Sequence, residues 1–221
     1  MRILATVLCA LFCPLAALMI TLSPPVTHWL AEAYVDSSGS SFSHEQLVEL
    51  ADAVRDFSLG NDQAFLPTGT DYRSAITAEA LTHLLDVRVV FLSCEAAAVL
   101  VMLALVICGI QLVRRRGLGA LRRPLIEGGA IPLCLAALLA LAVWLDFTTF
   151  FRLLHGLFFA AGSWVFPADS LLIRALPEPF WLGCALVWTA ATITLCLVCV
   201  AGGFFIGRRG HTQETAKTAI P

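Results

Sequence analysis

Residues 89–112 decide the fold: they read VVFLSCEAAAVLVMLALVICGIQL, with Glu95 as the one charged side chain. This stretch exceeds the roughly 20 apolar residues that an α-helix needs to cross a bilayer. Three further stretches meet the same requirement, from Ile3 to about Leu22, from about Ile126 to Leu145 and from about Phe180 to Ile206. The sequence therefore predicts an all-α, polytopic membrane protein with four transmembrane helices.

The composition of the chain agrees with a lipid environment. Of the 221 residues, 59% are hydrophobic and 14% are charged, and the mean hydropathy is +0.85. Soluble domains carry about 25% charged residues, so this chain has too few charges to cover a water-exposed surface of its size. The first apolar stretch is longer than the core of about 7–15 residues in a signal peptide, and Ser23-Pro24-Pro25 offers no cleavage motif. We expect it to remain as a transmembrane helix.

Positive charges are distributed unevenly between the connections, and this predicts the topology. The connection between the second and third spans holds five arginines, whereas residues 23–88 hold three arginines against ten acidic residues. Both termini are therefore expected in the cytoplasm. The predicted parts are transmembrane helices over 1–22, 89–112, 126–145 and 180–207, outer segments over 23–88 and 146–179, a basic cytoplasmic loop over 113–125 and a cytoplasmic tail over 208–221. From residue 211 the tail is polar and without periodicity, and we expect disorder there.

The first outer segment is predicted to be partly helical. Ser43-His44-Glu45-Gln46 indicates a capping box, apolar residues follow at helical spacing, and Gly60 can end this helix. A turn rich in Gly, Asp, Asn and Pro is expected over 60–71. A second helix is expected to begin near Ser74 or Thr77 and to continue without a break into the second span, because residues 77–108 contain neither Gly nor Pro.

The second outer segment is aromatic. Between Asp146 and Phe166 the Phe and Trp residues are Phe147, Phe150, Phe151, Phe158, Phe159, Trp164 and Phe166. The apolar run over 153–166 is too short to cross a bilayer, and aromatic side chains favour the depth of the headgroups. We expect an interfacial or re-entrant segment beside the helical outer segment.

The cysteines all fall within apolar stretches. They are Cys9, Cys13, Cys94, Cys108, Cys134, Cys184, Cys196 and Cys199. No disulfide framework is therefore available outside the hydrocarbon. The CxxC at Cys196 and Cys199 has no second pair and no nearby histidine, so we interpret the thiols as small apolar packing residues and predict no metal site.

Two histidines in the outer segments are the candidates for chemistry. Sequence motifs of soluble hydrolases, zinc proteases and nucleotide-binding proteins are absent, as is a basic aromatic patch for nucleic acid. On the helix that enters the second span, His83 shares a face with the carboxylates of Glu79 and Asp86. In the aromatic segment, the polar residues nearest to His155 are Arg152, Asp146 and Asp169.

Both histidines adjoin the membrane on the predicted outer side. The ester groups of lipids and lipoproteins lie at this depth, where an imidazole suits proton transfer at an ester carbonyl. An interfacial histidine can also serve as an amphipathic anchor alone. The rival class is a membrane scaffold or receptor subunit that binds a partner through its acidic outer loop. A transporter is disfavoured because four spans leave little room for a pathway and mid-span charges are absent, since Glu95 lies near one end of its span. A different acyl transfer or hydrolysis would use the same histidines.

The two histidine segments resemble signatures of the lipoprotein intramolecular transacylase family. The first is Glu79…His83…Asp86-Val87-Arg88. The second is Asp146-Phe147…Phe150…His155-Gly156-Leu157-Phe158-Phe159…Trp164…Pro167…Asp169…Leu172-Ile173…Pro177-Glu178…Phe180-Trp181. The order of one span, a large outer loop and three spans also fits. Leu154 departs from the phenylalanine expected before the histidine, and residues 37–41 match nothing in the pattern.

The resemblance implies an activity in the bacterial cell membrane. The sn-2 acyl chain of a diacylglyceryl-modified cysteine passes to the α-amino group of that cysteine, which gives the lyso form of the lipoprotein. It implies His83 and His155 as catalytic residues, with Asp86, Glu79, Arg152, Trp164, Asp169 and Asp146 as orienting or substrate-binding residues. No cofactor, nucleic acid or obligate protein partner is implied, and the partners are the lipoprotein substrate and membrane lipid.

Overall fold

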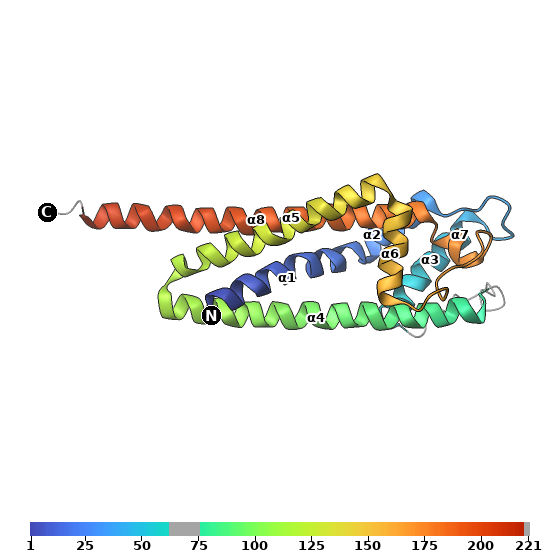
Figure 1. Cartoon of the computed structure of the whole chain (residues 1–221), viewed down its shortest axis with the longest axis horizontal. Helices are drawn as coiled ribbons and strands as arrows, with labels where there is room; N and C mark the ends of the chain where they lie inside the picture. The colour runs from blue at the N-terminus through green and yellow to red at the C-terminus, as the bar shows by residue number, and fades with distance from the viewer. Residues whose placement is uncertain (62–75, 219–221) are drawn as a thin grey trace. The chain divides into compact units, whose positions relative to one another are not determined.

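The computed structural model describes residues 1–61 and 76–218, with side chains as far as Ile206. Every regular element in these ranges is helical (Figure 1). The elements are α1 (Arg2–Thr21), α2 (Pro24–Tyr34), α3 (His44–Ser58), α4 (Ala78–Arg116), η1 (Leu118–Leu121), α5 (Arg122–Leu145), α6 (Phe147–Phe158), α7 (Leu171–Ala175) and α8 (Glu178–Thr218). Of the turn predicted over residues 60–71, the part from residue 62 onward lies outside the described residues.

Four helical stretches are long and apolar enough to cross a membrane, as predicted. They are Arg2–Thr21, Ala78–Arg116, Leu118–Leu145 and Glu178–Ile206. The predicted continuity of the second stretch is confirmed, since α4 is a single helix of 39 residues. At a rise of about 1.5 Å per residue this helix is about 58 Å long, against about 30 Å of hydrocarbon. Residues 89–112 can therefore cross the bilayer while the first turns of α4 remain outside it.

The chain forms two compact units. The first unit contains residues 1–18, 96–140 and 188–221. Glycines permit close packing in this unit. A Cβ atom at Gly128 would lie 2.6 Å from the Cβ atom of Cys9, and one at Gly129 would lie 2.7 Å from the carbonyl oxygen of Cys196. Both distances are far below an ordinary contact, so only glycine fits at these positions without displacing a neighbouring helix.

The second unit contains residues 19–95 and 141–187 and has its own apolar core. Leu30, Leu47 and Leu50 are almost fully buried in this core, together with side chains from α7 and the first turns of α4. The predicted capping box of α3 is confirmed: the hydroxyl of Ser43 accepts the backbone N–H of Gln46, whose side chain accepts the backbone N–H of Ser43.

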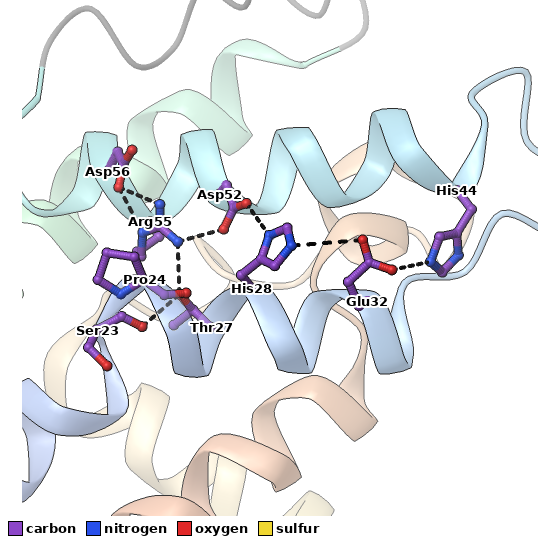
Figure 2. A network of polar contacts seen from close by, with 9 residues as sticks. All are labelled: Ser23, Pro24, Thr27, His28, Glu32, His44, Asp52, Arg55 and Asp56. Atoms are coloured by element: carbon purple, nitrogen blue, oxygen red, sulfur yellow. Dashed lines mark hydrogen bonds and ion pairs between the residues drawn. The ribbon is translucent and has the colours of Figure 1, made fainter.

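Helix α2 was missed by the sequence interpretation, although Ser23 precedes two prolines at the first helical positions, which is a helix-start signal. Polar side chains join α2 to α3 (Figure 2). His28 Nδ1 lies 2.6 Å from Asp52, and Arg55 donates to Asp52 and to the hydroxyl of Thr27, which lies 3.0 Å away. His28 therefore links the two helices.

The prediction of a disordered tail is wrong for residues 211–218. Helix α8 continues to Thr218. Extending an existing helix avoids the cost of nucleation, and Gln213, Glu214, Ala216 and Lys217 are good helix formers. The polar composition of the tail therefore does not break the helix.

Candidate active site

His83 is positioned by the first turns of α4. The hydroxyl of Thr77 accepts the backbone N–H of Ala80 at 3.2 Å, which caps the start of the helix. His83 and Leu84 lie three and four residues after Ala80, so they share its helix face, and all three are buried. The hydrophobic core of the second unit therefore holds the imidazole on the inner face of α4.

His155 is positioned by α6. Asp146 caps this helix by accepting the backbone N–H of Thr149 at 3.0 Å. One turn before the histidine, the carbonyl oxygen of Phe151 lies 2.9 Å from His155 Nδ1 and accepts its proton. This bond fixes the tautomer, so the neutral ring presents the lone pair of Nε2 as a proton acceptor.

The two imidazoles lie together in the second unit. Their ring centroids are 6.1 Å apart and the ring planes differ by 30°. An ester group between or beside the rings is therefore within reach of both side chains. The sequence predicted that both histidines lie near the same membrane surface. In the structure their side chains lie together in one site.

Aromatic side chains enclose the pair. Phe159 lies 4.8 Å from His83, measured between ring centroids, and Phe166 lies 5.7 Å from it. Trp164 lies 4.9 Å from His155. These rings come from the aromatic segment, and they make the surroundings of the imidazoles largely apolar.

Two buried nitrogens of this site have no hydrogen-bond partner among the described residues, His83 Nδ1 and Trp164 Nε1. An unsatisfied buried polar atom costs about 1–3 kcal/mol, so such atoms are rare and commonly mark a function. The indole N–H can only donate. A ligand with a carbonyl oxygen would satisfy it.

Burial keeps both imidazoles neutral. It lowers the pKa of His83 to about 4, helped by the neighbouring His155 and opposed by the charge of Asp86. Burial also lowers the pKa of His155, although the hydrogen bond to the Phe151 carbonyl acts in the opposite direction and raises it. Both side chains are therefore uncharged at neutral pH and available as proton acceptors.

The model of the family described as lipoprotein intramolecular transacylase Lit matches residues 3–181. The chain belongs to this family. It is therefore a membrane protein of the Lit transacylases, as the two signature segments indicated. No functionally curated protein matches the sequence.

Solved structures share the fold of this Lit family member. The in meso structure of the membrane-integral lipoprotein intramolecular transacylase Lit from Bacillus cereus has 16% sequence identity and a TM-score of 0.79, and the match covers 96% of each chain. A form of the same Bacillus cereus protein with a histidine replaced by alanine has 17% identity and a TM-score of 0.75, over 96% of this chain and 94% of the other.

The other residues expected at the Lit site have different positions. Trp164 joins the histidines, and Asp86 acts on His83 through its charge. Asp146 caps α6 and so positions His155 through the helix. Glu79, Arg152 and Asp169 are exposed.

Residues that hold α6 against α8 were not predicted. Thr148 donates to Glu178 at 3.1 Å, and the rings of Phe151 and Trp181 lie 6.3 Å apart. Glu178 and Trp181 appear in the second signature of the family, which was a signal for their importance. The structure suggests that they orient the helix that carries His155.

Among the described residues, three cysteines of the first unit could together hold a metal ion. The Sγ atoms of Cys9, Cys13 and Cys199 all lie within 4.8 Å of one another, and those of Cys13 and Cys199 are 3.9 Å apart. Three thiolates could hold a soft metal ion. Three clustered thiols also pack as small apolar groups, which remains our interpretation.

Proposed function

We propose that this protein moves the sn-2 acyl chain of a diacylglyceryl lipoprotein to the α-amino group of its N-terminal cysteine. The observation that carries the proposal is the pair of neutral imidazoles, His83 and His155, at 6.1 Å in an aromatic enclosure. The family membership supports transacylation in general, and the site supplies the proton acceptors that this reaction requires.

In the proposed reaction, the amine nitrogen attacks the ester carbonyl carbon and a C–N bond forms. The nitrogen becomes more acidic as this bond forms, and Nε2 of His155 accepts its proton. The C–O bond to glycerol then breaks, and an imidazolium returns the proton to the glycerol oxygen. The products are an amide and a free hydroxyl group, so atoms and charge balance without a cofactor.

Trp164 has a role in this scheme. Negative charge develops on the carbonyl oxygen in the tetrahedral intermediate, and the buried N–H of Trp164 is a donor with no other partner among the described residues. A donor aimed at the developing charge lowers the barrier more than it strengthens substrate binding. His83, whose Nδ1 has no partner in the described part of the chain, completes the polar surroundings of the ester.

Proximity supports an intramolecular route. Ester and amine belong to one substrate molecule, and well-oriented intramolecular reactions reach effective molarities of about 10⁵–10⁸ M. The amine has an ordinary pKa of about 7.7–8.0, so a fraction is uncharged at neutral pH. Modest proton acceptors such as the two neutral histidines therefore suffice.

The proposed location is the bacterial cytoplasmic membrane with both termini inside and the histidines facing outward. The arginine-rich connection over 113–125 and the acidic segment over 23–88 support this orientation. Acyl chains of the substrate would then extend into the outer leaflet beside the aromatic α6.

The test replaces His83 or His155 with Ala and measures acylation of a diacylglyceryl lipopeptide by mass spectrometry. Each variant is expected to lose at least about 100-fold in rate, the scale of general acid–base catalysis. His44→Ala is the control, because His44 is an exposed histidine of the same unit. Undiminished conversion by both active-site variants would refute the assignment.

A further inference from the structure

A cavity of about 490 Å³ lies in the second unit beside the histidine pair. Its lining comes from residues 39–42, the start of α4 and residues 166–174. Phe166 and Ala80 line it, while Phe166 also contacts the ring of His83. The volume falls in the range of about 300–1,000 Å³ that is typical of ligand pockets.

The cavity lies on the side of His83 that faces away from the apolar part of α4. Ala80 stands one turn before His83, and Thr77, which caps the helix, stands about two turns before it. At 1.5 Å per residue these positions are about 5–9 Å farther from residues 89–112 than the histidine is. A ligand held at the histidines with its acyl chains toward the membrane would extend its other end into this cavity.

The lining suits a polypeptide backbone. The hydroxyls of Ser40, Thr77 and Ser170 each accept a backbone N–H of a nearby residue. The hydroxyls of Ser40 and Ser170 each keep a proton to donate, for example to a peptide carbonyl. The hydroxyl of Thr77 is hydrogen-bonded to the carboxylate of Glu79. Apolar side chains such as Leu171 and Ile76 also line the cavity, so it combines hydroxyl groups with apolar contact.

Arg174 holds the walls of the cavity together. Its guanidinium donates to the carbonyl oxygens of Asp169 and Ser38, and its own carbonyl accepts the backbone N–H of Asp36 at 2.9 Å. The loop before α3 is thereby fixed to α7. A cavity with fixed walls needs little ordering when a ligand binds, which favours affinity.

We propose that this cavity binds the polypeptide segment that follows the acylated cysteine of the lipoprotein. This inference rests on the proposed function. The cysteine must sit at the histidines, and an extended chain advances about 3.3 Å per residue, so two or three residues reach from there to the capped start of α4. The carbonyl oxygens of the segment would accept from the hydroxyls of Ser40 and Ser170.

The test compares two synthetic substrates that carry the same diacylglyceryl group, one on a cysteine amide and one on a cysteine followed by five residues. With the wild-type protein in detergent micelles, the KM of the longer substrate is expected to be about tenfold lower, which corresponds to about 1.4 kcal/mol. Equal KM values for the two substrates in the wild type would overturn the inference while leaving the acyl transfer intact. Conversion of neither substrate would refute the proposed function itself.

Ser41→Trp provides the matched test, because Ser41 lines the cavity and its replacement fills it. The tenfold difference between the substrates is expected to disappear in this variant. Glu45→Trp adds the same side chain at an exposed position of α3 outside the lining and is expected to keep the difference. A full tenfold difference in Ser41→Trp would place the peptide elsewhere, whatever the absolute rate of the variant.

Discussion

The indole nitrogen of Trp164 is buried without a partner in the described part of the chain, while its ring lies 4.9 Å from that of His155. A donor and a proton acceptor therefore stand side by side in one aromatic enclosure. An ester that enters this enclosure meets both requirements of acyl transfer, removal of a proton from the nucleophile and stabilisation of the oxyanion.

Trp164→Phe keeps an aromatic ring and removes the donor. We expect kcat to fall by about 10²–10³, as for the loss of an oxyanion donor, with KM nearly unchanged. Steady-state kinetics on a diacylglyceryl lipopeptide measure both constants. Trp29→Phe is the control, because Trp29 is an exposed tryptophan of the same unit. A rise in KM without a fall in kcat would instead assign Trp164 to ground-state binding.

The histidine pair predicts a loss of stability in acid. The folded protein holds His83 with a pKa of about 4, whereas an unfolded histidine has a pKa of about 6.5. Between these values the unfolded state binds more protons, so the stability present above pH 6.5 is lost as the pH falls toward 4, by up to about 3 kcal/mol. The melting temperature of the detergent-solubilised protein, measured from pH 7 to 4, should fall accordingly. His83→Gln should flatten this slope, and an equal slope in the variant would contradict the prediction.

The fold could be predicted from the sequence because length and hydropathy are sufficient for transmembrane helices. The capping box at Ser43 and the continuity of α4 were also readable, since both depend on neighbouring residues alone. The helix α2 was missed because its residues mix polar and apolar types without a clear period. Its stability comes from packing on α3 and from the contacts of Arg55, which the sequence does not reveal.

The reactive residues of the candidate site could be predicted from the sequence, but the atoms that surround them could not. His83 and His155 were identified as the reactive residues, and the structure places their rings together. The unpaired donor at Trp164 and the tautomer of His155 depend on which atoms surround them in space. Six further residues were expected to orient the substrate, and their roles remain predictions.

The thiol cluster of the first unit predicts an activity that is independent of metal. If Cys9, Cys13 and Cys199 are packing residues, the rate of acyl transfer should not change when a strong metal chelator is added. Cys13→Ala should lower the melting temperature, because this side chain is fully buried and its removal leaves a small void. Elemental analysis of the purified protein checks the interpretation directly. One equivalent of copper or zinc that is lost in Cys13→Ala would make the cluster a metal site.

Because the packing at Gly128 is close, adding a methyl group there should strongly destabilise the protein. A Cβ atom there would lie 2.6 Å from the Cβ atom of Cys9 and 2.8 Å from the carbonyl oxygen of Thr6. Backbone cannot move aside as a flexible side chain can, so Gly128→Ala should cost about 1–3 kcal/mol. Gly109→Ala is the matched control, because a Cβ atom at this helical position would meet nothing within 4 Å. Thermal unfolding of both variants in detergent measures the difference, and equal melting temperatures would mean that α1 and α5 pack less closely than the structure has them.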